Sequence, residues 1–328
     1  MYTTTKLVNL RIASNKMKKS LLCLLLMLLC GHIKAQDLHP YERLVTEEVL
    51  FDRVSWLADD ANRGRASGTS GKACAEQFIS RHFRKLGMKP YNWYYTQSFR
   101  YRDSIILRNV IGVVTASKPS SEYVIVSAHY DHLGEIDGRI FNGADDNASG
   151  VAVLLSLAEM FSGMKADGTG PEKNIIFIAF DGKELSMAGS KYFVKHLDIP
   201  ASKVTAAVNI DIIGTGLVPP GKSSDYMIAI GENRLRPDYR NLLKYVCRRP
   251  ELNLDFHPDF YGSRNFTKVV YENGDHWSFA RKGIPAVFIT SGFHQYTYKT
   301  GDDTEIINFP LLRKRTLAIY HYINLLCH

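Results

Sequence analysis

The order of apolar and polar positions along the chain predicts alternating helices and strands. Residues 174–180 (NIIFIAF) form an almost uninterrupted apolar run, which is typical of a strand buried on both faces. Residues 68–86 carry apolar side chains at helical spacing and predict an amphipathic helix. Further strands are expected at 110–114, 124–127, 204–213 and 285–290, and further helices at 151–161, 184–196 and 311–326. This alternation predicts an α/β fold: a doubly wound, mostly parallel mixed sheet flanked by helices.

The sequence pattern of residues 36–328 predicts one domain. No internal repeat, low-complexity tract or linker interrupts them in the sequence, and their number suits one large domain. Residues 215–272 have the weakest periodicity of this stretch. We expect them to supply loops over a binding face.

The first 35 residues have the pattern of a secretory signal. Two basic residues, Lys18 and Lys19, follow Met17 and precede a short apolar run at 21–30, and Ala35 offers a small residue for cleavage. Met17 is a better start than Met1, which makes residues 1–16 a candidate mis-assigned extension. The apolar run is too short to span a bilayer, so we expect no integral membrane span. A lipid anchor at Cys30 is a weaker alternative, and the expected location is periplasmic or extracellular.

Removal of this leader changes the charge of the chain. The whole sequence has 41 Lys and Arg residues against 33 Asp and Glu residues, but six of the basic residues lie within residues 1–35. The remainder therefore has a net charge of about +2. This near-balance gives no reason to expect a nucleic-acid partner. Cys74, Cys247 and Cys327 are odd in number and lack metal-ligand spacing, and nothing in the sequence indicates the oligomeric state.

Polar residues that can bind a metal follow the predicted strands. In open α/β sheets, ligands bind beyond the carboxyl ends of the strands. Histidine nitrogens and carboxylate oxygens are the usual ligands of hydrolytic zinc. Several carboxylates buried together would otherwise repel one another and take up protons, so a cation is their natural partner. The residues that this edge of the sheet should gather are His129, Asp131, Asp146, Glu184 and Asp211.

Four motifs carry a resemblance to a known family. They are 127–134 (SAHYDHLG), 142–150 (NGADDNASG), 209–214 (NIDIIG) and 283–288 (GIPAVF). In order and spacing they resemble the M28 zinc exopeptidases, and the resemblance spans nearly all of residues 36–328. It implies the phosphorylase/hydrolase-like zinc exopeptidase fold and aminopeptidase-type activity. The protease-associated insert of the family is expected to be absent, because Arg108 and Asn109 lead straight into a core strand.

The resemblance also implies a set of ligands. His129, Asp146 and Asp211 would hold one zinc ion. Asp146 would bridge to a second zinc, held by Glu184 and by a histidine near the C-terminus. Asp131 would orient His129 by accepting the other ring N–H. The pair at 275–276 (DH) resembles a short element of the family that we expect to be structural.

Two positions depart from the family pattern. Lys183 stands where the family has the glutamate that accepts a proton from metal-bound water, and an ammonium group cannot do so unless its pKa falls by several units. The last histidine ligand is also missing. Alignment on residues 303–304 places Lys299 there, and a one-residue slip places Tyr298 there. His294 is a weaker candidate, since ligand spacing tolerates little slack.

Charge balance then favours one metal ion over the two of the family pattern. Three carboxylates, of Asp146, Glu184 and Asp211, are neutralised by one zinc ion together with the Lys183 ammonium. We therefore expect one zinc, with Lys183, alone or with Lys299, replacing the second cation by pairing with Glu184.

Three functions are compatible with this sequence. The first is an exported zinc metalloexopeptidase of aminopeptidase type that hydrolyses N-terminal residues of peptides. Its activity would be weakened, or its site would hold a single metal ion. The second is an inactive relative that binds peptides or amino acids in the same cleft, which Lys183 and the missing histidine favour. The third is an acyl transferase similar to glutaminyl cyclases, which use one zinc. Peptides or amino acids are the expected partners in the first two cases.

Overall fold

The computed structural model describes residues 40–102 and 105–328. Tyr41–His328 form one compact unit. The predicted secretory leader, with Cys30 and the cleavage point at Ala35, lies outside the described residues.

A mixed sheet forms the centre of this unit. Its nine strands within the described residues follow the order β1-β3-β7-β4-β8-β11-β9-β10, and β2 also pairs with β3, outside this order. The central strands β7, β4, β8 and β11 are mutually parallel, while β3 and β9 join them antiparallel. The predicted α/β mixed sheet is confirmed: four parallel strands form its centre, and β9 and β10 form a further parallel pair at one edge. The strands are β1 Lys89–Pro90, β2 Thr96–Tyr101, β3 Ile105–Val114, β4 Tyr123–His129, β7 Asn174–Phe180, β8 Val204–Ile210, β9 Tyr226–Ile230, β10 Asp255–His257 and β11 Ala286–Thr290.

Helices cover both faces of the sheet, and strand β7 shows why. Its residues are all buried, and successive side chains point to opposite faces. Ile175 and Phe177 belong to the apolar cluster under α2, α4 and α9, whereas Ile176 and Ile178 belong to the cluster under α5 and α8. The helices are α2 Glu47–Leu57, α3 Ser70–Lys85, α4 Gly150–Ala166, α5 Ala188–Lys195, α6 Leu242–Cys247, α7 Arg264–Glu272, α8 His276–Arg281 and α9 Phe309–Cys327.

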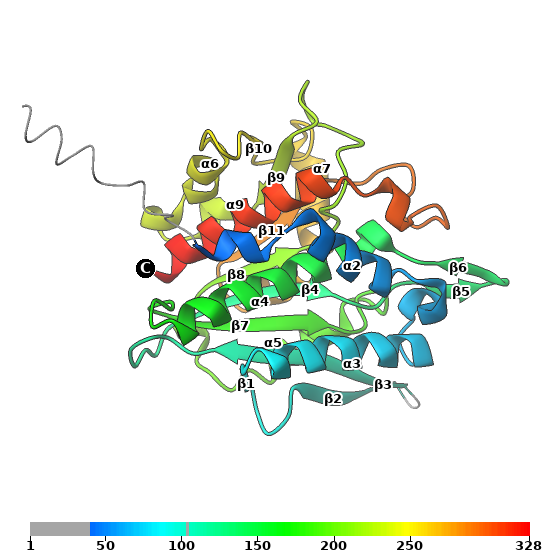
Figure 1. Cartoon of the computed structure of the whole chain (residues 1–328), viewed down its shortest axis with the longest axis horizontal. Coiled ribbons are helices and arrows are strands. Elements are labelled where there is room, and N and C mark those ends of the chain that lie inside the picture. Colours follow the sequence, from blue (N-terminus) through cyan, green and yellow to red (C-terminus); the bar gives the residue numbers. More distant parts are fainter. Residues whose placement is uncertain (1–39, 103–104) are drawn as a thin grey trace, which may run out of the picture. The chain divides into compact units, whose positions relative to one another are not determined.

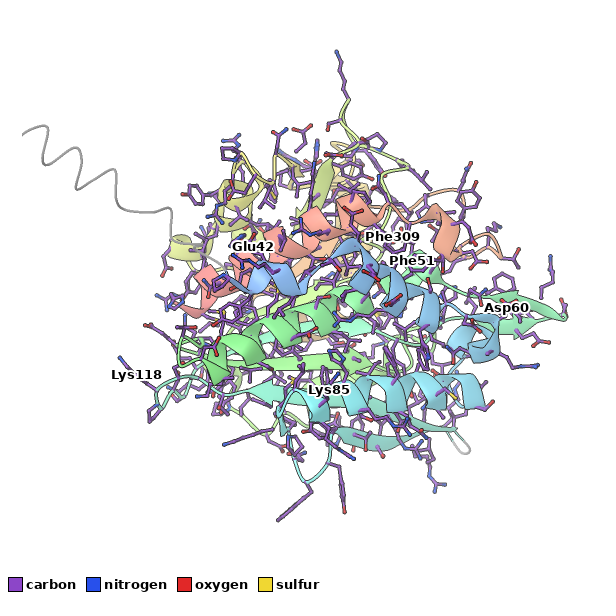
Figure 2. All side chains as sticks on the ribbon, viewed as in Figure 1. Glu42, Phe51, Asp60, Lys85, Lys118 and Phe309 are labelled. Carbon is purple, nitrogen blue, oxygen red and sulfur yellow. The ribbon has the colours of Figure 1, made fainter. Side chains whose placement is uncertain are left out.

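Helices α2, α4 and α9 lie side by side on one face (Figure 1). Phe51 of α2 meets Phe309 at the start of α9, with ring centroids 5.3 Å apart (Figure 2). The helical stretch Ala144–Ala166, which includes α4, is long and apolar enough to cross a membrane by length and composition. Within the described residues it packs as a core helix, with 83% of its most apolar window buried.

Residues 215–272 are more ordered than their sequence pattern predicts. They contain β9, β10, α6 and α7. The five residues of β9 are all buried between β11 and β10, so this stretch supplies core elements as well as the expected loops. The short lengths of β10 and α6 explain the weak periodicity, because three to six residues are too few to establish a period.

The buried guanidinium of Arg65 ties together three segments that surround the site. Arg65 is 1% exposed. It donates hydrogen bonds to the backbone carbonyls of Leu57 (2.6 Å), Tyr130 (3.0 Å), Asn142 (2.6 Å) and Gly143 (3.0 Å). These carbonyls lie at the end of α2, just after β4 and just before the helical turn Ala144–Ser149.

Replacing Arg65 with methionine is therefore expected to lower the free energy of unfolding by at least about 3 kcal/mol, because buried carbonyls would lose their donors. Urea denaturation of residues 36–328 measures the change. The matched control is Arg63→Met, which removes only an exposed ion pair with Glu135 and should cost at most about 1 kcal/mol. Equal losses in the two variants would contradict the role given to Arg65.

Candidate metal centre

Adjacent strands of the parallel centre position the candidate ligands. His129 is the last residue of β4, and Asp211 directly follows β8, its neighbour in the sheet. Asp146 lies in the helical turn Ala144–Ser149 that leads into α4. The loop after β7, on the other side of β4, carries Lys183 and Glu184. The carboxyl ends of these parallel strands meet at one edge of the sheet, as ligand sites in such folds require.

Three predicted ligands converge on one point. The Nε2 atom of His129 lies 3.2 Å from Oδ1 of Asp146 and 3.1 Å from Oδ1 of Asp211. One ligand atom from each of the three residues lies within 4.8 Å of the others, and all three residues are buried. The other ring nitrogen of His129, Nδ1, lies 3.0 Å from the backbone carbonyl of Asp131. A proton held on Nδ1 by this carbonyl leaves the Nε2 lone pair free for a metal ion.

The chemistry of these atoms fits a divalent cation. Oδ2 of Asp146 is buried and has no hydrogen-bond partner among the described residues. Burial lowers the pKa of His129, but the carboxylates of Asp211 and Asp146 outweigh this effect and raise the pKa well above its ordinary value. Two carboxylates and an imidazole nitrogen form a three-ligand set that leaves a coordination position open, as catalytic zinc sites require.

Asp131 supports this cradle differently from the expectation. Its carboxylate was expected to accept the Nδ1 proton of His129, but Oδ1 lies 3.8 Å from that nitrogen. The carboxylate instead accepts backbone N–H groups from Lys183 (3.0 Å) and Glu184 (3.1 Å). Asp131 therefore orients His129 through its backbone carbonyl and fixes the loop after β7 through its side chain. Burial raises the pKa of Asp131 to about 7.

The ammonium group of Lys183 lies inside the site. Its Nζ is 2.9 Å from Oε1 of Glu184 and 3.4 Å from Oδ1 of Asp146, and its side chain is only 9% exposed. Burial lowers the pKa of Lys183, but the carboxylates of Asp146, Asp211 and Glu184 raise it well above its ordinary value. The group at the position of the family's general base is thus a fixed cation at neutral pH.

Tyr298, rather than Lys299, faces the site from the C-terminal loop. The Tyr298 hydroxyl lies 3.5 Å from Lys183 Nζ, which sits 5.4 Å from the centre of the tyrosine ring. Lys299 is exposed, and no contact joins its side chain to the cradle within the described part of the chain. His294 does not point to the cradle either, because its Nε2 contacts Oδ2 of Asp145 at 3.1 Å. Of the three sequence-based candidates for the missing ligand, only Tyr298 reaches Lys183.

His132 is a further neighbour of the site, and it was not among the candidate ligands predicted from the sequence. Its Nδ1 lies 3.9 Å from Oδ1 of Asp146, and ligand atoms of His132, Asp146 and Glu184 lie within 4.8 Å of one another. Both ring nitrogens are buried without a hydrogen-bond partner among the described residues. Burial lowers the pKa of His132 to about 3, so the ring is neutral. The Lys183 ammonium already contacts both carboxylates of this second group.

Asp302 is a supporting residue that the sequence did not reveal. Its carboxylate accepts hydrogen bonds from the backbone N–H groups of Asp145 (2.7 Å) and Asp146 (3.0 Å). Asp302 therefore holds the backbone at Asp146 in place from the C-terminal loop. The 157-residue separation between Asp145 and Asp302 explains why no local pattern predicted this contact. By contrast, the ring of His276 packs 4.7 Å from that of Tyr271 and 4.6 Å from that of Phe288.

The buried histidine–carboxylate cradle at the carboxyl ends of parallel strands has the kinds of ligand that hydrolytic zinc sites use, and it could hold a metal ion. The chain belongs to peptidase family M28, whose family model matches residues 109–323. Aminopeptidase YwaD of Bacillus subtilis (strain 168) is 35% identical over 115 residues, which are 33% of this chain and 22% of that protein. Matches to curated relatives cover between 13% and 58% of the relatives' own lengths, so the chain spans less than two thirds of each.

Solved structures show the same fold. A zinc aminopeptidase from Bacillus subtilis superposes with a TM-score of 0.65 at 14% identity, covering 85% of this chain and 95% of that chain. Fimbriiglobus ruber glutaminyl cyclase superposes with a TM-score of 0.69 at 20% identity, covering 86% and 95%. Two different activities are thus named among proteins of this fold, and the site residues must decide between them.

Proposed function

We propose that the chain binds a single zinc ion through His129, Asp146 and Asp211 and acts as an aminopeptidase-type exopeptidase on peptides. The observation that carries this proposal is the position of Lys183. Its ammonium group contacts Asp146 and Glu184, the two carboxylates that the family pattern assigns to a second zinc. One zinc ion and this ammonium neutralise the three carboxylates of the site, whereas two zinc ions would leave an excess of positive charge. Local charge balance therefore supports one ion.

The chain's own residues have distinct tasks in this proposal. His129, with Nδ1 held by the carbonyl of Asp131, presents Nε2, and Asp146 and Asp211 present carboxylate oxygens. Bound zinc would supply an acidic water molecule and polarise the scissile carbonyl. Lys183 donates hydrogen bonds to the two carboxylates beside it and holds its own proton. Without a carboxylate base at position 183, hydrolysis is expected to be slower by roughly 10²–10⁴ than with one.

Release of a chromophore from aminoacyl anilides tests the proposed activity. Zinc-loaded protein should release the chromophore slowly, and His129→Ala protein should not. The same preparation assayed with an N-terminal glutaminyl substrate tests for the acyl transfer of the glutaminyl cyclases. Cyclisation of that substrate without anilide hydrolysis would contradict the aminopeptidase proposal.

A peptide-binding protein without turnover is the second candidate. The fixed cation at position 183 and Tyr298 at the place of the last ligand favour it, because each removes a group that the family's hydrolysis uses. A peptide with a free N-terminus that binds to zinc-loaded protein and remains intact, with zinc, cobalt or manganese present, would select this candidate. Both candidates share the same single-metal cradle.

Export of the protein to the periplasm or outside the cell is part of the same proposal. It rests on the basic and apolar pattern of residues 17–35. Mature protein recovered from an exporting host should begin at Gln36. Recovery of the full chain from the cytoplasm would contradict export.

A further inference from the structure

A hollow of about 300 Å³ lies between α5 and α8, the two helices on the face of the sheet opposite to α2, α4 and α9. Met187, Val194 and Trp277 form its apolar lining. The ring of Trp277 packs edge-on against Tyr271, with centroids 5.9 Å apart, so the indole has a supported position. A concave site of this size, with aromatic and aliphatic lining, suits a small organic molecule.

Four cations surround this apolar lining. Lys191 and Lys195 are one turn apart on α5, while Arg281 and Lys282 close the end of α8. All four residues are exposed, and the lining contains no acidic residue. Lys195 and Arg281 lie in the last turns of their helices, where a cation interacts favourably with the helix dipole, whereas Lys191 and Lys195, one turn apart, repel each other. A hollow with low-dielectric walls and one sign of charge concentrates the field that attracts an oppositely charged ligand.

Little of this charge is used within the protein. Lys191 donates a hydrogen bond to the backbone carbonyl of Ser186 (2.6 Å). No ion pair joins a carboxylate to Lys191, Lys195, Arg281 or Lys282 in residues 40–102 and 105–328. The cations are therefore available to a ligand from solution.

We propose that this hollow binds a small organic anion with an apolar body. The body rests on Trp277 and Val194, and the anionic group lies among the cations of α5 and α8. The size of the hollow, its apolar lining and its single sign of charge each favour this ligand class over a neutral molecule or a bare inorganic anion. This binding site is separate from the cradle of His129, Asp146 and Asp211 and goes beyond the proposed peptidase function.

Titration with 4-phenylbutyrate tests this site, with the Trp277 indole N–H resonance as the readout. The chain has three tryptophans, and Trp277→Phe assigns the resonance. 4-Phenylbutyrate should shift this signal saturably. The neutral amide of the same acid and inorganic phosphate should each bind at least about 10-fold more weakly. The amide lacks the negative charge, and phosphate lacks the apolar body.

Charge reversal supplies the second arm of the experiment. Lys195→Glu with Arg281→Glu should weaken 4-phenylbutyrate binding at least about 10-fold. Lys85→Glu with Lys118→Glu makes the same change in net charge on residues outside the hollow (Figure 2) and should leave the affinity unchanged. An absent or unsaturable shift, equal binding of the amide, or equal effects of the two double variants would overturn the proposal.

The His129→Ala protein separates this inference from the proposed function. Binding of 4-phenylbutyrate should persist in that variant. Loss of binding in that variant would show that the carboxylate of 4-phenylbutyrate binds at the metal cradle, and would overturn the assignment to the hollow. Conversely, failure of the chain to bind zinc would leave the expected result at Trp277 unchanged.

Discussion

His129→Ala is expected to weaken zinc binding by at least about 100-fold. The imidazole is the one nitrogen ligand of the three-residue cradle, and its Nε2 lies between the carboxylates of Asp146 and Asp211. Changes to residues that merely orient a ligand already cost 10- to 100-fold in metal affinity, so loss of the ligand itself should cost no less. Competition of the protein with a coloured zinc chelator measures the affinity.

The matched control for this variant is His294→Ala. His294 is also buried and also contacts an aspartate, but that aspartate is Asp145 rather than a cradle residue. Zinc affinity in the control should stay within about threefold of the unaltered protein, because no predicted ligand is lost. Undiminished zinc binding by His129→Ala, or an equal loss in both variants, would contradict the ligand set.

The double variant Lys183→Glu with Tyr298→His is expected to gain a second zinc ion and to hydrolyse aminoacyl anilides roughly 10²–10⁴ faster. The first change replaces the fixed cation between Asp146 and Glu184 with a carboxylate that can accept a proton. The second change places an imidazole at the residue that now contacts Lys183. Zinc stoichiometry and anilide release measure the two effects independently.

Two controls show which part of the double variant matters. Lys183→Met removes the ammonium without adding a base, so it should not raise the rate of hydrolysis. Lys183→Glu with Lys299→His offers the histidine one position later, on an exposed side chain, and should bind one zinc. A double variant that binds one zinc and hydrolyses no faster than the unaltered protein would show that Lys183 and Tyr298 do not limit this site.

The central strands could be predicted from sequence because burial on both faces leaves a continuous apolar run. The predicted strand 174–180 has the same bounds as β7. The predicted strand 204–213 continues past β8, which ends at Ile210, because apolar residues also follow the strand. The predicted helix 184–196 begins too early, since α5 starts at Ala188. Backbone groups at Lys183 and Glu184 are held by the distant Asp131, and a local pattern cannot contain that contact.

The candidate metal centre could also be predicted from the sequence only in part. Its main residues follow from strand ends, because the carboxyl ends of parallel strands meet at one edge, and this rule alone places His129 beside Asp211. The directions of side chains do not follow from sequence spacing. The choice between Tyr298 and Lys299 depends on the backbone of one loop, where Tyr298 has a positive φ of 60°. The support from Asp302 and the nearness of His132 to Asp146 depend on tertiary packing.

Zinc stoichiometry of the unaltered protein tests the central claim most directly. Purified protein, dialysed against a low concentration of free zinc and then analysed for metal and for protein, should contain one tightly bound zinc ion per chain. Two tightly bound zinc ions per chain would show that the Lys183 ammonium leaves the second position free, and would contradict this account.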